Sequence, residues 1–222
     1  MRSRHLFQLA SLALALTAAA TTQAATGAPA GWPAGYAYHD YSTVPALLHQ
    51  ASSAFALQYT HDGWVKFDQI PLQDATFVRV FGTGQHKIAM YADPNCKETQ
   101  AWEKWANKHL KDATVYTFAI PLIHGDDDSL SQQFVCRTSN QDRAHAWEKW
   151  LFTAHKPSPI PDCHSALPLS FAHALRGGNQ KITVGGTTYQ FGRISPFFVS
   201  ESGRIAIGDA TGPTFYSLYR QK

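Results

Sequence analysis

The sequence lacks most of the residue patterns that indicate a cofactor or a metal ion. It has only three cysteines in 222 residues, Cys96, Cys136 and Cys163, and no Cys-x-x-Cys pair. Its eleven histidines show no metal-ligand spacing, and no glycine-rich phosphate loop is present. We therefore expect neither a bound metal ion nor a cofactor.

Long apolar runs are also missing. The apolar run at residues 6–16 is interrupted twice and falls short of the roughly 20 residues that a bilayer span needs. Arg2 and Arg4 precede it, and Thr-Gln-Ala at 22–24 resembles a signal-peptidase site. We expect residues 1–24 to be a cleaved signal peptide, and we expect the remaining chain to have no membrane span and to reside in the periplasm.

A strong charge of one sign is absent too. The formal net charge is +3, and without Arg2 and Arg4 it falls to about +1. No basic stripe of the kind that binds a phosphate backbone is present, so we expect no nucleic-acid partner. In an oxidising compartment thiols tend to pair, and three cysteines leave one over. The count alone does not decide which one.

The first part of the expected mature chain shows weak patterns. Residues 25–35 are rich in Gly, Pro and Ala, which favours a flexible leader. Apolar residues at helical spacing predict a short helix over 43–58, and alternation predicts strands over 64–70 and 76–81. We assign residues 25–84 to a flexible leader and a small N-terminal α+β region.

The next segment has a clearer pattern. Residues 87–92 predict a buried strand, residues 98–110 an amphipathic helix, and residues 115–123 a second buried strand. Cys96 lies in the loop between the first strand and the helix, and Asn95 is a candidate N-cap. This βαβ unit places a cysteine at the start of a helix.

The remainder is predicted to be mostly helical over 126–175 and then to form two hairpins and a helix. The first hairpin pairs 181–184 with 187–191 around Gly185 and Gly186. The second pairs 197–200 with 204–207, and 214–220 is the last helix. The pentapeptide Ala-Trp-Glu-Lys-Trp occurs at 101–105 and again at 146–150, which we interpret as two amphipathic helices packing tryptophan into a core.

The order βαβ then ββα, with a cysteine after the first buried strand, resembles the thioredoxin fold. Tyr-Ala-Asp-Pro-Asn-Cys at 91–96 resembles the active-site loop of the DsbC/DsbG-type periplasmic thiol:disulfide isomerases. Ile-Ser-Pro-Phe-Phe-Val at 194–199 resembles the family's Thr-cis-Pro loop, with Ser195 in place of threonine. The resemblance covers about 85–222. It implies an α/β thioredoxin-like domain there, with an inserted helical segment at about 126–175.

The resemblance also implies roles for particular residues. Cys96 takes the place of the redox nucleophile, and Ser195 and a cis Pro196 take the place of the substrate-binding loop beside it. Cys136 and Cys163 fall where the family carries a structural disulfide. The family's dimerisation domain is not carried over, because residues 36–84 are short for it.

The departure from the family pattern is Thr99, which stands where a second, resolving cysteine is expected. A lone thiol can attack a disulfide and shuffle it, but net oxidation or reduction needs two thiols. A helix N-terminus and Lys97 favour a lowered pKa for Cys96, whereas Glu98 opposes it. Thr99 either tunes Cys96 by a hydrogen bond or marks a site without catalysis, and an inert buried Cys96 is the alternative to a reactive one.

Three functional hypotheses follow. The first is a periplasmic disulfide isomerase-like enzyme that acts on disulfide-containing client proteins through Cys96 alone. The second is a non-catalytic thioredoxin-fold chaperone or assembly factor that binds extended segments along the Pro196 loop. The third is an enzyme that uses a redox partner or a small thiol such as glutathione for turnover.

Overall fold

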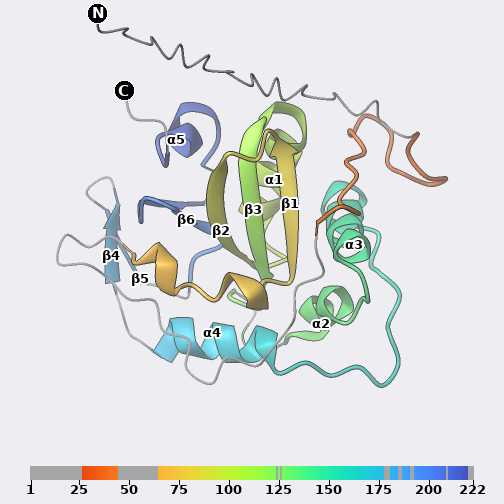
Figure 1. Cartoon of the computed structure of the whole chain (residues 1–222). Coiled ribbons are helices and arrows are strands. Elements are labelled where there is room, and N and C mark those ends of the chain that lie inside the picture. Colours follow the sequence, from red (N-terminus) through yellow and green to blue (C-terminus); the bar gives the residue numbers. More distant parts are fainter. Residues whose placement is uncertain are drawn as a thin grey trace, which may run out of the picture.

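Figure 1 shows the computed structural model of the chain. The structure describes residues 27–44, 65–123, 125, 127–177, 181–184, 187–190, 193–208 and 210–219. The predicted signal peptide and nearly all of the helix predicted over 43–58 lie outside these residues. The elements are η1 (Phe67–Gln69), η2 (Leu72–Asp74), β1 (Phe77–Gly82), β2 (His86–Ala92), α1 (Lys97–His109), β3 (Asp112–Ala119), α2 (Ser129–Val135), α3 (Asn140–Thr153), α4 (Leu167–Gly177), β4 (Lys181–Val184), β5 (Thr187–Gln190), β6 (Phe197–Ser200), β7 (Ile205–Ile207) and α5 (Gly212–Tyr216).

A five-stranded mixed sheet in the order β1-β3-β2-β6-β7 forms the centre of the molecule. β2 and β3 are parallel and are joined by α1, whereas β1, β6 and β7 pair antiparallel with their neighbours. This is the βαβ and ββα plan of a thioredoxin fold, as predicted. The hairpin β4–β5 forms a separate two-stranded sheet.

The sheet is buried on both faces because its central strands alternate between two cores. Along β2, Ile88, Met90 and Ala92 belong to a core that includes Trp102 of α1. Ala89 and Tyr91 point to the opposite core, which includes Phe171 of α4. Helices therefore cover both faces, which explains why the strand at 87–92 is a continuous apolar run.

The inserted helices cover the outer edge of β1. Asn140, at the start of α3, accepts a hydrogen bond from the Val78 amide (2.7 Å) and donates one to the Val78 carbonyl (2.8 Å). Arg143 donates to the Thr76 carbonyl at 3.3 Å. A side-chain amide thus takes the place of a neighbouring strand, and the edge is protected from pairing with another chain.

A fully buried charge cluster ties α1 and α3 to the sheet. Arg79 of β1 forms a bidentate ion pair with Glu103 of α1, and its Nη1 lies 3.5 Å from Oε1 of Glu148 in α3. Trp147 donates to Glu103 at 2.7 Å, and Tyr41 donates to Glu148 at 2.8 Å. The two glutamates are the central residues of the two pentapeptides. A buried arginine needs such partners, because an unpaired charge in a core is very costly.

The residues that follow the predicted leader of 25–35 have fixed contacts. Asn107 exchanges two hydrogen bonds of 2.9 Å with the backbone of Ala37, and the Tyr36 ring stacks on Phe152 at 3.9 Å. Tyr41 is fully buried. Residues 36–41 are therefore held against α1 and α3 by aromatic packing and by the side-chain hydrogen bonds to the Ala37 backbone.

Some elements differ from prediction. In the described part of the strand predicted over 64–70, residues 65–70 form no strand: Val65 makes an isolated bridge, and η1 follows, with Pro71 unable to donate to a ladder. The strand predicted over 115–123 begins at Asp112 and ends at Ala119, ahead of Pro121. β1, which lies before the predicted start of the thioredoxin-like domain at residue 85, pairs with β3 in the central sheet.

Candidate functional site

The loop that carries Cys96 is shaped by a buried carboxylate. β2 ends at Ala92, and Asp93 follows with no exposed surface. Its Oδ1 accepts from the Asn95 amide and its Oδ2 accepts from the Ile123 amide, both at 2.8 Å. The Cys96 amide donates to the Asp93 carbonyl at 3.1 Å. These bonds fold the chain sharply, and they make Cys96, rather than the expected Asn95, the N-cap residue of α1.

The Ser195–Pro196 loop lies directly against Cys96. The Ser195–Pro196 peptide bond is cis. The Ser195 carbonyl accepts a hydrogen bond from Cys96 Sγ at 3.0 Å, and Ser195 Oγ accepts one from the Asp93 amide at 2.7 Å. Two segments about a hundred residues apart in sequence are therefore in direct contact.

Thr99 faces the same loop rather than the sulfur. Its side chain is fully buried in the first turn of α1, and its Oγ1 lies 3.1 Å from Ser195 Oγ. Thr99 thus links α1 to the cis-proline loop by a hydroxyl–hydroxyl bond. Its backbone amide, together with that of Glu98, favours a thiolate at Cys96.

The electrostatic balance at Cys96 differs from the prediction. Cys96 is only 3% exposed, and its Sγ donates a hydrogen bond to Oε2 of Glu98 at 2.9 Å. Burial and then the Glu98 carboxylate raise the pKa of the Cys96 thiol, and together they outweigh the lowering by the Glu98 and Thr99 amides. The expected lowering of this pKa is wrong, because the helix N-terminus acts here on a desolvated sulfur beside a negative charge.

Three site residues carry roles that the sequence did not reveal. Asp93 orders the loop, Glu98 contacts the sulfur, and Trp150 of α3 donates from Nε1 to the Pro94 carbonyl at 2.8 Å. Glu98 was visible beside Cys96, but only as an opposing charge. The bond from Trp150 crosses 56 residues, and no local pattern indicates it.

The other two cysteines lie apart from this site, in the helical insertion. Cys136 and Cys163 form a disulfide with a Cα–Cα distance of 5.9 Å, which leaves Cys96 as the free cysteine. Beside the disulfide, Gln132 of α2 accepts from the Ser165 amide at 2.9 Å and donates to its carbonyl at 2.7 Å. The irregular segment after α3 is therefore fastened to α2 at neighbouring points.

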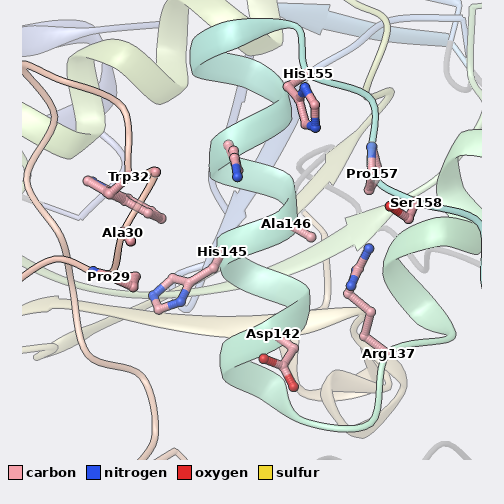
Figure 2. Close-up of a pocket in the computed structure, with 12 residues that line it drawn as sticks. Pro29, Ala30, Trp32, Arg137, Asp142, His145, Ala146, His155, Pro157 and Ser158 are labelled. Atoms are coloured by element: carbon pink, nitrogen blue, oxygen red, sulfur yellow. The ribbon is translucent and has the colours of Figure 1, made fainter.

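A cavity of about 270 Å³ lies on the outer side of α3, between residues 29–32 and 155–158 (Figure 2). Its lining includes the basic side chains of Arg137, Lys149 and His155. None of the residues predicted from the sequence to form the site lines it. In the parts of the chain that the structure describes, no helix is long and apolar enough to cross a membrane, and no cluster of three potential metal-ligating acidic, His or Cys side chains occurs.

Several known proteins that are similar to this chain are named disulfide interchange proteins. A protein of Bordetella avium named probable thiol:disulfide interchange protein DsbC is 29% identical over 127 residues, which are 57% of this chain and 42% of the relative. A protein of Bordetella parapertussis with the same name is 31% identical over 102 residues, 45% of this chain and 33% of the relative. The crystal structure of a disulfide interchange protein from Neisseria gonorrhoeae matches with a TM-score of 0.52 and 25% identity, over 67% of this chain and 95% of that chain. Over part of its length, this chain is similar to DsbC-type thiol:disulfide interchange proteins.

The DsbC-type relationship confirms the predicted family and the thioredoxin fold. No protein-family model matches the chain. The alignment spans 42% and 33% of the two Bordetella proteins, less than half of either.

Proposed function

We propose that the chain is a periplasmic thiol:disulfide interchange protein of the DsbC type, which rearranges disulfides in client proteins through Cys96 alone. The observation that carries the proposal is the contact of Cys96 Sγ with the carbonyl of Ser195, beside the cis Pro196, at the start of α1. The DsbC-type relatives support the assignment to this chemistry.

The proposed cycle conserves electrons within the client. Cys96 loses its proton, and its thiolate attacks one sulfur of a client disulfide, forming a mixed disulfide and releasing the other client sulfur as a thiolate. A client thiolate then attacks the client sulfur bound to Cys96. That step forms a new client disulfide and returns the Cys96 thiolate, which takes up a proton. Because Thr99 offers no second thiol, the cycle isomerises disulfides without net oxidation or reduction.

The neighbours of Cys96 have defined parts in this cycle. The Glu98 and Thr99 amides stabilise the thiolate when it forms. Asp93 and Thr99 keep the Cys96 loop and the Ser195–Pro196 loop in register. A client segment lying along the Ser195–Pro196 loop would bring its disulfide to the sulfur, in the way that extended peptides bind to exposed backbone.

The test is refolding of a scrambled multi-disulfide protein in buffer that contains a catalytic amount of small thiol. The chain should speed recovery of the native disulfides, and Cys96→Ala should abolish this effect. Thr99→Cys should add net oxidase or reductase turnover. If Cys96→Ala is as effective as the unaltered chain, the interchange function is wrong.

A second candidate is a non-catalytic chaperone or assembly factor. The observation that favours it is the burial of Cys96 together with the raised pKa of its thiol, since both slow attack on a disulfide. This candidate predicts client binding that survives Cys96→Ala and yields no mixed disulfide on a non-reducing gel. The interchange function predicts a Cys96-dependent adduct that disappears on reduction.

A further inference from the structure

Glu98 accepts a hydrogen bond from the sulfur that the proposed function needs. Cys96 Sγ has one proton and two acceptors within 3.0 Å, the Glu98 carboxylate and the Ser195 carbonyl. With both bonds in place the Cys96 side chain is buried, whereas Glu98 is exposed on the first turn of α1. The bond from sulfur to carboxylate therefore closes a site that must open before a disulfide can reach it.

The carboxylate also opposes the reactive form of the cysteine. A thiolate in place of the thiol would lie 2.9 Å from another negative charge. Of the other charged side chains near the sulfur, Asp93 is engaged by the Asn95 and Ile123 amides, and Lys97 is exposed. The Ser195 loop contacts the sulfur through a neutral carbonyl group. Helix α3 contacts the loop before Cys96 through the neutral indole of Trp150, which binds the Pro94 carbonyl. Glu98 is thus the negative group in direct contact with Sγ.

A carboxylate that is exposed and forms one bond to the site can be drawn away by a stronger partner. A lysine or arginine on an incoming segment would pair with Glu98 outside the site, which would free Sγ and remove the repulsion from its thiolate. An acidic segment would be repelled and would leave the bond to Sγ intact.

We propose that Glu98 is a latch on Cys96, which holds the thiol closed until a client segment with basic side chains beside its disulfide pairs with the carboxylate. This inference rests on the proposed function and names the client chemistry that the same site favours. No electron transfer is added: the bond between Sγ and Glu98 breaks, the thiol proton leaves to solvent, and the exchange with the client disulfide follows.

The experiment compares the intact chain with Glu98→Gln, which keeps the shape of the side chain and removes its charge. Alkylation of Cys96 by iodoacetamide at pH 7 should become about tenfold faster in the variant, because the thiolate that reacts no longer lies 2.9 Å from a negative charge. Lys97→Gln is the matched control, since it alters a neighbouring exposed charge that does not contact the sulfur. It should not accelerate alkylation.

Two short peptide disulfides, identical except for lysines or glutamates beside the cysteines, test the client preference. The intact chain should exchange about tenfold faster with the lysine peptide at low salt, and the preference should shrink at 1 M salt, where charges are screened within about 3 Å. Glu98→Gln should exchange with both peptides at similar rates. Equal alkylation rates in the intact chain and Glu98→Gln, or an unchanged lysine preference in Glu98→Gln, would overturn the latch.

These outcomes are separable from a failure of the proposed function. Alkylation and peptide exchange report on the thiol itself, whether or not the chain refolds scrambled proteins. If Glu98→Gln accelerates alkylation but the chain does not speed refolding, the latch hypothesis stands and the isomerase hypothesis is wrong. If the chain speeds refolding but Glu98→Gln leaves the alkylation rate unchanged, the isomerase hypothesis stands and the latch hypothesis is wrong.

Discussion

The two copies of Ala-Trp-Glu-Lys-Trp, at 101–105 in α1 and at 146–150 in α3, bury the same two residues but have different partners. In each copy the first tryptophan and the glutamate are fully buried. The lysine is exposed in α1 and half-buried in α3, and the second tryptophan is half-buried in both. Helical geometry fixes which residues of the motif turn inward.

The glutamates of the two copies differ in how fully they are paired. Glu103 binds Arg79 through both oxygens and accepts from Trp147. Glu148 has one 3.5 Å contact with Arg79 and a bond from Tyr41, and its buried Oε2 has no partner within the described residues. Burial, opposed by Arg79, raises the pKa of Glu148 to about 7.

The second tryptophans differ as well. Trp105 packs edge-on against Phe215 and Tyr216 near the C-terminal helix α5. Trp150 donates to the Pro94 carbonyl, two residues before Cys96. The same five residues therefore support the core in one helix and connect the insertion to the candidate site in the other. Local sequence sets the orientation of a side chain, and the neighbouring elements set what it contacts.

The largest expected effect comes from removing the cation that both copies share. Arg79→Met should lower the free energy of unfolding by about 3–5 kcal/mol, because it leaves two carboxylates buried without a counter-charge. Urea unfolding measures the change. Lys104→Met, in the exposed position of the first pentapeptide, is the control and should stay within about 0.5 kcal/mol. A loss below about 1 kcal/mol for Arg79→Met would show that the cluster does not hold α1 and α3 to the sheet.

The next prediction separates the two glutamates. Glu103→Gln should cost about 3 kcal/mol at pH 7, since it breaks a bidentate buried pair. Glu148 binds its proton up to about pH 7 in the folded chain but only to about pH 4.3 when unfolded, so this group makes folding less favourable as pH rises between these values. Glu148→Gln removes that slope. The free energy of unfolding of the native chain, relative to Glu148→Gln, should therefore fall from pH 4.5 to pH 7. A difference that stays constant over this range contradicts the assignment.

Most of the fold could be predicted from the sequence because it depends on local periodicity. The run at 87–92, the helix that follows Cys96 and the two hairpins each have a pattern that the structure reproduces within a few residues. The strand predicted over 64–70 does not form in the described residues 65–70, because Val65 is buried at an isolated bridge and Ile70 at the end of η1 rather than in a ladder. The pentapeptide pattern predicts the buried tryptophans but not the pairing of the glutamates, because their partner Arg79 lies in a different element.

The site was predicted only as far as the resemblance extended. Cys96, Thr99, Ser195 and Pro196 come together, but the state of the sulfur depends on its depth and on the rotamer of Glu98. Neither the depth of the sulfur nor the rotamer of Glu98 can be predicted from the spacing of residues along the sequence. A helix N-terminus lowers the pKa of a thiol only where its effect is larger than the opposing effects of burial and neighbouring negative charge. At Cys96 the opposing effects are larger.

The smallest expected effect tests the contrast between the second tryptophans. Trp150→Phe keeps the aromatic packing and removes the hydrogen bond to Pro94, at a cost of about 1 kcal/mol. Because that bond fixes the loop before Cys96, its loss should raise the population of open loop, and with it the alkylation rate of Cys96, by about fivefold. Trp105→Phe, which shortens the equivalent ring in the first pentapeptide, is the matched control and should leave this rate unchanged even where it lowers stability. Equal rates in the two variants would mean that α3 supports the fold but does not position the nucleophile. A faster rate in Trp150→Phe alone, at a stability equal to that of Trp105→Phe, would make Trp150 a positioning residue of the Cys96 loop.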